Sequence, residues 1–285
     1  MKKQYVLPLL RTALLMAAAC VMLVPVVLTF VNSFMTEGEI TVNYGMLGSN
    51  SSSELVNMKW IPDWVSFGQY YKVLIATPQF LHMFWNSVKM VVPIIIGQVA
   101  VASLAAFAFA KLRFPGRESL FFIYLLAMLM PFQVTLVPNY IVADELGLLN
   151  SPASIVLPGV FAAFGVFLLR QFMLHIPSAY MEAAKMDGAG YIRSFVTIAL
   201  PMVKPGIAAL VVLLFADYWN MVEQPLIFLH DAELQPLSVF LSRIQKEAFD
   251  VSFAASVVYM TPMLLLFLCM ERYFIEGIQL SGIKG

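Results

Sequence analysis

The sequence is poor in charged residues. Asp, Glu, Lys and Arg make up 12% of its 285 residues, whereas soluble domains carry roughly 25%. The formal net charge is zero, so no overall basic field attracts nucleic acid. With 61% hydrophobic residues, this composition excludes an ordinary soluble protein and indicates an integral membrane protein.

The sequence also lacks the motifs of common catalytic and metal sites. Cys20 and Cys269 lie in apolar runs, which is typical of small hydrophobic packing residues rather than of a disulfide or metal pair. The three histidines have no metal-ligand spacing, and no H-E-x-x-H or G-x-S-x-G pattern occurs. No G-x-x-x-x-G-K-[ST] loop is present to hold a nucleotide phosphate. We therefore expect no enzyme activity, no metal and no cofactor in this chain.

The N-terminus combines positive charges with a long apolar run. Lys2, Lys3 and Arg11 precede this run, and Cys20 follows three alanines in a pattern that loosely resembles a lipoprotein cleavage site. A signal-peptide core is short, about 7–15 residues, whereas a membrane-spanning helix needs about 20. Because the apolar run continues to Phe34, we expect an uncleaved first helix.

Six apolar runs are long enough to cross a bilayer as helices, and the intervals between them contain Gly, Pro, Ser, Asn and charges. The predicted fold is a single all-α membrane domain over residues 1–285. Its spans cover about 12–34, 87–110, 119–142, 153–175, 206–229 and 253–274.

The distribution of Lys and Arg predicts the orientation. With the N-terminus in the cytoplasm, that side and the adjoining span ends carry all but five of the basic residues. Such an excess is typical of the cytoplasmic side. We therefore expect both termini and the segment 176–205 in the cytoplasm. The five basic residues on the outer side are Lys59, Lys72, Lys89, Arg243 and Lys246.

The first outer loop, about 35–86, is long. Residues 45–57 are rich in Gly, Ser and Asn and are predicted to be flexible. The stretch from Trp60 to Trp64 and the pair Tyr70-Tyr71 are aromatic, which favours an interfacial anchor over a partner-binding segment. Each predicted span contains a proline, which indicates either tolerance of proline in membranes or bent helices that move.

A polar segment between the fourth and fifth spans is the most distinctive part of the chain. Residues from Ser178 to Lys185 are rich in helix formers, and Ala179, Ala183 and Met186 can share one helix face. Gly188 and Gly190 then permit a sharp turn, and a second helical piece is expected from Tyr191 to Leu200. Physical reasoning alone leaves two interpretations open, an interfacial connector and a docking surface.

The spacing in this segment resembles the signature of a known family. It reads Glu182-Ala183-Ala184, three residues, Gly188, nine residues, and then Ile198-x-Leu200-Pro201. This pattern resembles that of permease subunits of bacterial ABC importers that use a binding protein. Further landmarks are similar to the six-span permease subunit of the carbohydrate-uptake group, over nearly the whole chain. They are Asn32-Ser33-Phe34, Gln133 to Pro138, Phe167 to Phe172, Trp219-Asn220 and Pro225-Leu226.

The resemblance implies a multi-pass subunit of the bacterial inner membrane with the type I importer fold. It implies a second homologous permease, two ATP-binding subunits that hold ATP and Mg, and an extracytoplasmic solute-binding protein as partners, with membrane lipid around the spans. The Glu-Ala-Ala helix would dock on the ATPase through polar contacts of Glu182, close approach at Ala183 and Ala184, and a turn at Gly188. The coupling residues implied by the resemblance are Glu182, Ala183, Ala184, Asp187 and Gly188.

A polar stripe is predicted in the fifth span. Asp217, Asn220 and Gln224 are spaced to share one helix face, with Glu223 nearby. Ionisable groups at membrane depth line cavities or pair between helices, so a substrate path and interhelical hydrogen bonding both remain open. Aromatic rings and planar polar groups also suit sugars. The path candidates are Asp217, Tyr218, Trp219, Asn220 and Gln224, with Gln133 and Asn139 in the third span.

Two alternative functions remain open at this point. The first is a permease for another solute, such as glycerol phosphate, because a permease sequence constrains its substrate weakly. The second is a membrane scaffold whose Glu182 loop only recruits a partner. ATP-dependent solute uptake separates a transporter from a scaffold.

Overall fold

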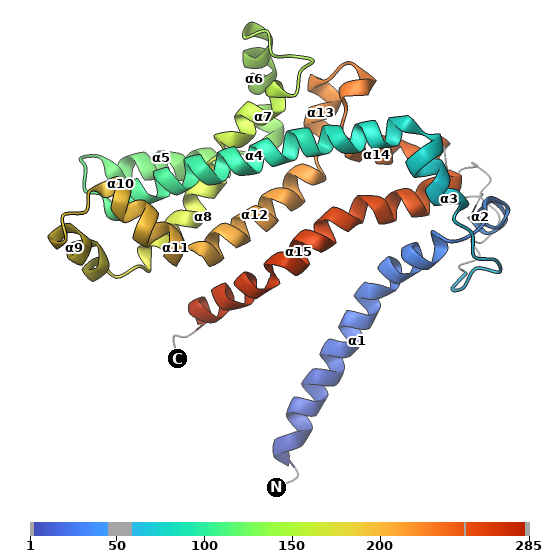
Figure 1. Ribbon diagram of the computed structural model, residues 1–285, viewed down its shortest axis with the longest axis horizontal. Helices are drawn as coiled ribbons and strands as arrows, with labels where there is room; N and C mark the ends of the chain where they lie inside the picture. The colour runs from blue at the N-terminus through green and yellow to red at the C-terminus, as the bar shows by residue number, and fades with distance from the viewer. Residues whose placement is uncertain (1–2, 45–58, 248, 283–285) are drawn as a thin grey trace. The chain divides into compact units, whose positions relative to one another are not determined.

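The computed structural model describes residues 3–44, 59–247 and 249–282, and every regular element in these ranges is helical (Figure 1). This agrees with the predicted all-α fold. A lipid-exposed chain must satisfy its backbone polar groups within each segment, and helices do so. The polar stretch 45–57, predicted to be flexible, lies outside the described residues.

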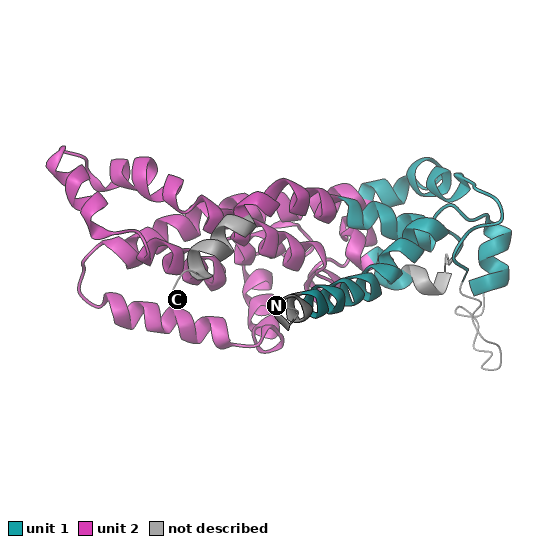
Figure 2. Ribbon diagram, turned by 90° about the horizontal axis from the view of Figure 1, so that it is seen from below, with its two compact units in different colours: residues 1–82, 240–261 teal, residues 83–239, 262–285 magenta. Residues whose placement is uncertain are grey.

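The chain divides into two compact units (Figure 2). Unit 1 comprises residues 1–82 and 240–261, and unit 2 comprises residues 83–239 and 262–285. Three of the described helices contribute to both units, namely α4 (Pro78–Lys111), α14 (Leu237–Glu247) and α15 (Ser252–Gly282).

Unit 1 is organised around the buried side chain of Gln69. Its Nε2 donates to the carbonyls of Asn32 (2.9 Å) and Met35 (3.0 Å), and its Oε1 accepts from the backbone N–H of Ala254 (3.2 Å). The carbonyls near the C-terminal end of α1 thus gain a partner that the helix itself cannot supply. The elements of unit 1 are α1 (Lys3–Asn32), α2 (Glu37–Tyr44), α3 (Gly68–Tyr71), the π-helical turn η2 (Lys72–Ala76), most of α14 (Leu237–Glu247), η5 (Phe249–Val251) and the start of α15.

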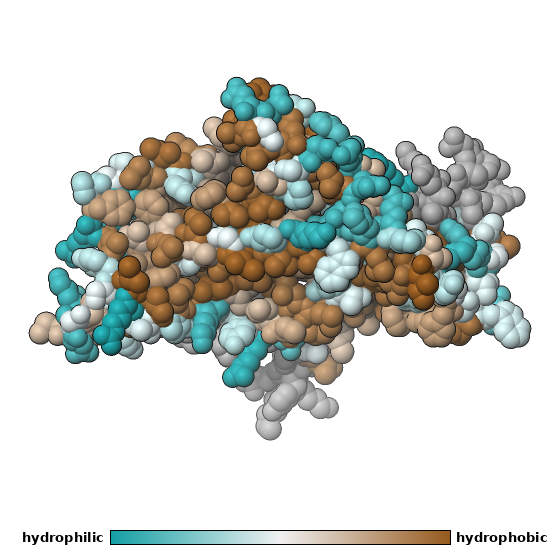
Figure 3. Space-filling model, turned by 45° about the horizontal axis from the view of Figure 1, so that its top comes forward, coloured by the Kyte–Doolittle hydropathy of each residue, from teal (hydrophilic) through white to brown (hydrophobic). Residues whose placement is uncertain are grey.

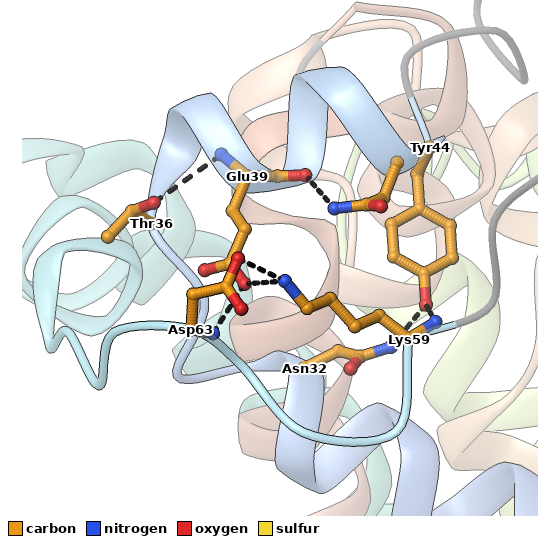
Figure 4. A network of polar contacts seen from close by, with 7 residues as sticks. Asn32, Thr36, Glu39, Tyr44, Lys59 and Asp63 are labelled. Carbon is orange, nitrogen blue, oxygen red and sulfur yellow. Dashed lines mark hydrogen bonds and ion pairs between the residues drawn. The ribbon is translucent and has the colours of Figure 1, made fainter.

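Ionic contacts stabilise the loop that follows α2 (Figure 4). Lys59 Nζ lies 2.9 Å from Glu39 Oε1 and also contacts Asp63, whose N–H donates to Glu39 (2.6 Å). Burial opposes ionisation of Glu39, but the hydrogen bonds from Asp63 and Lys59 outweigh it and lower the pKa of Glu39. Trp60 and Trp64 stay exposed, as an interfacial anchor and a partner-binding segment both require.

Lys72 connects two distant parts of unit 1. Its Nζ lies 2.8 Å from Glu37 Oε1 and 3.0 Å from Asp250 Oδ2. The hydrogen bonds to Glu37 and then to Asp250 raise the pKa of Lys72. The ammonium therefore stays charged throughout the physiological pH range and joins α2 to η5.

Unit 2 contains the remaining helices around a core from α4, α8 and α12. Its innermost side chains include Ala106, Leu169 and Leu210. The elements are the larger part of α4, α5 (Arg117–Leu129), α6 (Phe132–Glu145), α7 (Ala153–Val160), α8 (Ala163–Leu174), α9 (Ser178–Met186), α10 (Tyr191–Ser194), the π-helical η3 (Phe195–Ala199), α11 (Leu200–Met202), α12 (Lys204–Trp219), α13 (Glu223–Phe228) and η4 (Ala232–Leu234).

Within the residues that the structure describes, four helical stretches are long and apolar enough to cross a membrane, and the count rises to as many as six if each of two bent helix pairs is one span. Apolar side chains cover much of the surface that Figure 3 shows, and α1 exposes Leu14 (72%) and Met22 (76%). Extended apolar surface of this kind is rare on soluble monomers. The four stretches are Leu9–Asn32, Pro78–Lys111, Ala153–Leu174 and Ser252–Tyr273.

Two helix pairs are sharply bent, and bent helices are one of the two interpretations of the prolines in the predicted spans. α5 and α6 meet at 100° because Met130 and Pro131 have extended backbones. The second pair, Tyr191–Met202 with Lys204–Trp219, is bent by 73° and ends before the predicted limit at residue 229. The helix restarts only as α13, after the polar residue Asn220.

Candidate functional site

The Glu-Ala-Ala triplet lies on α9, a short helix at the surface of unit 2 (Figure 1). The helix begins at Ser178, after Pro177 in an extended conformation. Ala184 packs inward and is 6% exposed, whereas Glu182 and Ala183 are exposed and Met186 is 88% exposed. The face predicted from Ala179, Ala183 and Met186 is therefore open to a partner outside this chain.

A sharp turn ends α9 at Gly188. Its φ is +74°, a left-handed conformation that glycine adopts without steric cost. The N–H of Ala189 donates to the carbonyl of Ala184 (2.9 Å), and that of Gly188 donates to Lys185 (3.1 Å). These are the two hydrogen bonds of a Schellman cap. Gly190 has a φ of −71°, so the turn requires glycine at residue 188 and not at residue 190.

The segment after this turn enters the core. Phe195 is 7% exposed and Ala199 is fully buried, and both belong to the core of unit 2. They lie in η3, whose π-helical turn precedes Leu200 and Pro201. The second half of the family pattern thus connects the surface helix α9 to α12.

A cleft of about 800 Å³ lies beside α9. Lys111, at the end of α4, donates from Nζ to the carbonyl of Ile176 (2.6 Å), just before α9. This hydrogen bond joins the end of α4 to the segment that precedes α9. The lining residues that carry charge are Lys111, Arg113, Arg117, Glu182 and Lys185.

Arg170 joins three helices near this cleft. Its Nη2 lies 3.2 Å from Glu118 Oε2, and its Nε donates to the carbonyl of Phe109 at 3.5 Å. The guanidinium carbon lies 3.8 Å from the ring centre of Phe121, within the range of a cation–π contact. Arg170 on α8 therefore ties α4 and α5 to the helix that leads into α9.

Substitution of Arg170 by methionine is expected to lower the free energy of unfolding by about 1–3 kcal/mol. The upper part of that range is the size of a desolvated cation–π contact plus a partly exposed ion pair. Thermal unfolding of the purified chain measures the loss. Arg113→Met, at an exposed arginine, is the control, and equal losses from both substitutions would contradict this role.

A second cavity, of about 610 Å³, lies between α6, the end of α7, the end of α12 and α13. Asp217, Asn220 and Gln224 line it, together with Tyr218 and with Asn139 of α6. The single helical face predicted for the first three does not form, because α12 ends at Trp219. The helix is instead interrupted between Trp219 and Glu223, and these side chains all line the same cavity.

Two predicted path residues lie elsewhere. Trp219 is 2% exposed and stacks on Phe215 with ring centres 5.0 Å apart. Gln133 is exposed and does not line the cavity. Several lining residues were not predicted, because apolar side chains in a membrane span do not distinguish a cavity wall from a packed or lipid-facing surface. Only Pro158, a proline inside α7, marked this part of the span as unusual. The lining residues that were not predicted are Phe132, Pro158, Gly159, Ala162, Ala216, Met221 and Val222.

Several apolar helices, a polar cavity at helix breaks and a separate surface helix together define a membrane transport subunit. The chain belongs to the family described as binding-protein-dependent transport system inner membrane component, which matches residues 98–279. It is thus a multi-pass subunit of the inner membrane.

Two relatives illustrate the family. The arabinooligosaccharides transport system permease protein AraQ of Halalkalibacterium halodurans is 30% identical over 218 residues, covering 75% of this chain and 78% of the relative. The sn-glycerol-3-phosphate transport system permease protein UgpE of Pectobacterium atrosepticum is 34% identical over 207 residues, covering 71% and 74%.

The fold is similar to that of a chain in the crystal structure of a bacterial ABC transporter involved in the import of the acidic polysaccharide alginate. The TM-score is 0.79 at 22% identity, over 96% of this chain and 98% of the other. A second alginate transporter structure, in complex with a periplasmic protein bound to an alginate pentasaccharide, matches with a TM-score of 0.58 at 17% identity. It covers 72% of this chain and 81% of the other.

Proposed function

We propose that this chain is a permease subunit of an ATP-driven importer that moves a sugar or oligosaccharide across the cytoplasmic membrane. It pairs with a second, homologous permease around a central path. Two ATP-binding subunits dock from the cytoplasm, and an extracytoplasmic solute-binding protein delivers the substrate. This chain supplies path and coupling, and the partner subunits bind ATP and Mg. The arabinooligosaccharide relative and the alginate transporters support a carbohydrate substrate.

The observation that carries the proposal is the geometry of α9 in a chain of this family. Glu182 and Ala183 are exposed on a short helix that ends in a left-handed turn at Gly188. Small side chains permit close approach, and a capped helix moves as a rigid body. Docked on an ATPase, α9 transmits closure of the nucleotide sites through η3 to α12 and through Ile176 to α4.

The proposed mechanism is alternating access, in which ATP shifts the population between inward-open and outward-open states. Asp187 would cap the moving helix beside Gly188. The cavity lined by Asp217, Tyr218, Asn220, Gln224 and Asn139 would form part of the path. The termini and α9 would lie in the cytoplasm, as the distribution of basic residues favours.

Reconstitution tests this function. The chain is co-expressed with a candidate second permease, ATPase and binding protein from the same organism, and the purified assembly is placed in liposomes. Uptake of a labelled oligosaccharide that requires both ATP and the binding protein is the expected result. Assembly without ATP-dependent uptake of any tested solute would instead indicate a scaffold.

Glycerol phosphate is the second candidate substrate, because UgpE of Pectobacterium atrosepticum is 34% identical to this chain. A phosphate ester is negatively charged and a neutral sugar is not. The charged residues that line the path therefore bear on which of these two substrates it accepts.

A further inference from the structure

The path cavity between α6, α7, α12 and α13 carries negative charge only. Its lining includes two carboxylate residues, Asp217 and Glu223, and no lysine or arginine. Both carboxylate residues are exposed rather than packed away, and the ion pairs in the described part of the chain involve neither of them. Nothing in the lining offsets their charge.

The remaining lining groups suit an uncharged polyol. Asn139, Asn220 and Gln224 offer amides, which both donate and accept hydrogen bonds. Phe132 and Tyr218 add aromatic surface on which the C–H faces of a sugar can pack. A phosphate or uronate instead favours arginine or lysine, and the carboxylates of Asp217 and Glu223 repel it.

We infer that Asp217 and Glu223 make this cavity select against anionic solutes, and that the transported solute is therefore an uncharged carbohydrate. This inference rests on the proposed function, because it takes the cavity to be part of the path. It separates this chain from UgpE, a permease of an sn-glycerol-3-phosphate transport system, and from the transporter involved in the import of the acidic polysaccharide alginate. It also assigns Glu223 a role in specificity.

The contrast with the cleft beside α9 shows that the negative charge is local. That cleft is lined by Lys111, Arg113, Arg117 and Lys185, with Glu182 the only acidic residue in the lining. The chain as a whole is neutral. Exclusion of anions is therefore a property of the cavity and not of the whole molecule.

Charged thiol reagents measure this property directly. Cys20 and Cys269 are first replaced by serine, and Asn139→Cys places a single thiol in the cavity. The full-length chain in detergent is treated with a cationic or an anionic methanethiosulfonate, and the ratio of rates is compared with that for free cysteine. We expect the cationic reagent to be favoured by about tenfold or more, the effect of a unit charge several ångströms away in a partly solvated site.

Neutralisation of the two carboxylates tests whether they cause the preference for the cationic reagent. Asp217→Asn combined with Glu223→Gln should return the ratio to that of free cysteine, whereas Glu145→Gln, at an exposed carboxylate outside the lining, should leave it unchanged. Phe132→Cys provides a second thiol if Asn139→Cys does not fold. A ratio equal to that of free cysteine at both positions would overturn the inference.

Measurements of solute uptake distinguish failure of the inference about anions from failure of the proposed importer function. ATP-driven uptake of a labelled neutral trisaccharide supports the inference. Efficient uptake of sn-glycerol 3-phosphate by the unmodified assembly would overturn it while leaving the importer function intact. Loss of all ATP-driven uptake would remove the function and, with it, the conclusion about the solute, even with the reagent preference retained.

Discussion

Leucine at Gly188 is expected to lower ATP-driven uptake by about tenfold or more while the membrane helices stay folded. The φ of +74° at this residue costs a side-chain-bearing residue about 1–2 kcal/mol, and 1.4 kcal/mol corresponds to a tenfold change in population. The space around Gly188 is open, with no atom within 4 Å of an added Cβ. Backbone strain, rather than a clash, therefore causes the effect.

Two matched substitutions isolate this cause. Gly188→Asn should retain most uptake, because asparagine tolerates the left-handed region. Gly190→Leu should have little effect on the turn, since Gly190 also faces open space but has a φ of −71°. Uptake and ATP hydrolysis are measured together in liposomes. Normal coupling in a well-folded Gly188→Leu variant would remove the turn from the mechanism.

Alanine at Gly206 is expected to destabilise unit 2 by about 1–3 kcal/mol, the usual cost of overpacking. A Cβ at this residue would lie 2.5 Å from Cγ of Phe172 and 2.7 Å from Cδ2. The two residues bring α12 against α8. Because ring atoms rather than a flexible chain end are in the way, the helices must separate.

A second substitution tests this explanation. Phe172→Leu removes the ring and should restore part of the stability lost in Gly206→Ala, whereas Gly190→Ala should cost little because its surroundings are open. Thermal unfolding in detergent measures both changes. If Phe172→Leu did not improve the Gly206→Ala variant, contact between these two residues would not be the cause.

The membrane class and the surface segment were predictable from sequence because both depend on local patterns. The low charge and long apolar runs predict helices in lipid. The positions of Glu182, Gly188 and Pro201 predicted a helix, a turn and a second helical piece, and these elements are present. Whether this segment couples to an ATPase stays a prediction.

The positions and sizes of the helix bends were not predictable from local sequence patterns. Hydropathy continues through Pro131 and does not record that the chain turns by 100° there. The end of α12 at Trp219 was missed because the next residues also fit a helical period. The cavity depends on tertiary proximity of Asn139 and Asp217, and no local pattern encodes which aromatic residue, Tyr218 or Trp219, faces it.

The most direct test of the central claim is photo-crosslinking from α9. Met186 is 88% exposed, so Met186→Cys, in a chain without Cys20 and Cys269, can carry a benzophenone maleimide. In the assembled transporter, illumination should join this chain to an ATP-binding subunit, and the adduct should lose ATP-driven uptake. A second label is placed at Ala179→Cys, on the same exposed face of α9. If neither label formed an adduct with the ATPase and both left uptake unchanged, docking through α9 would be contradicted.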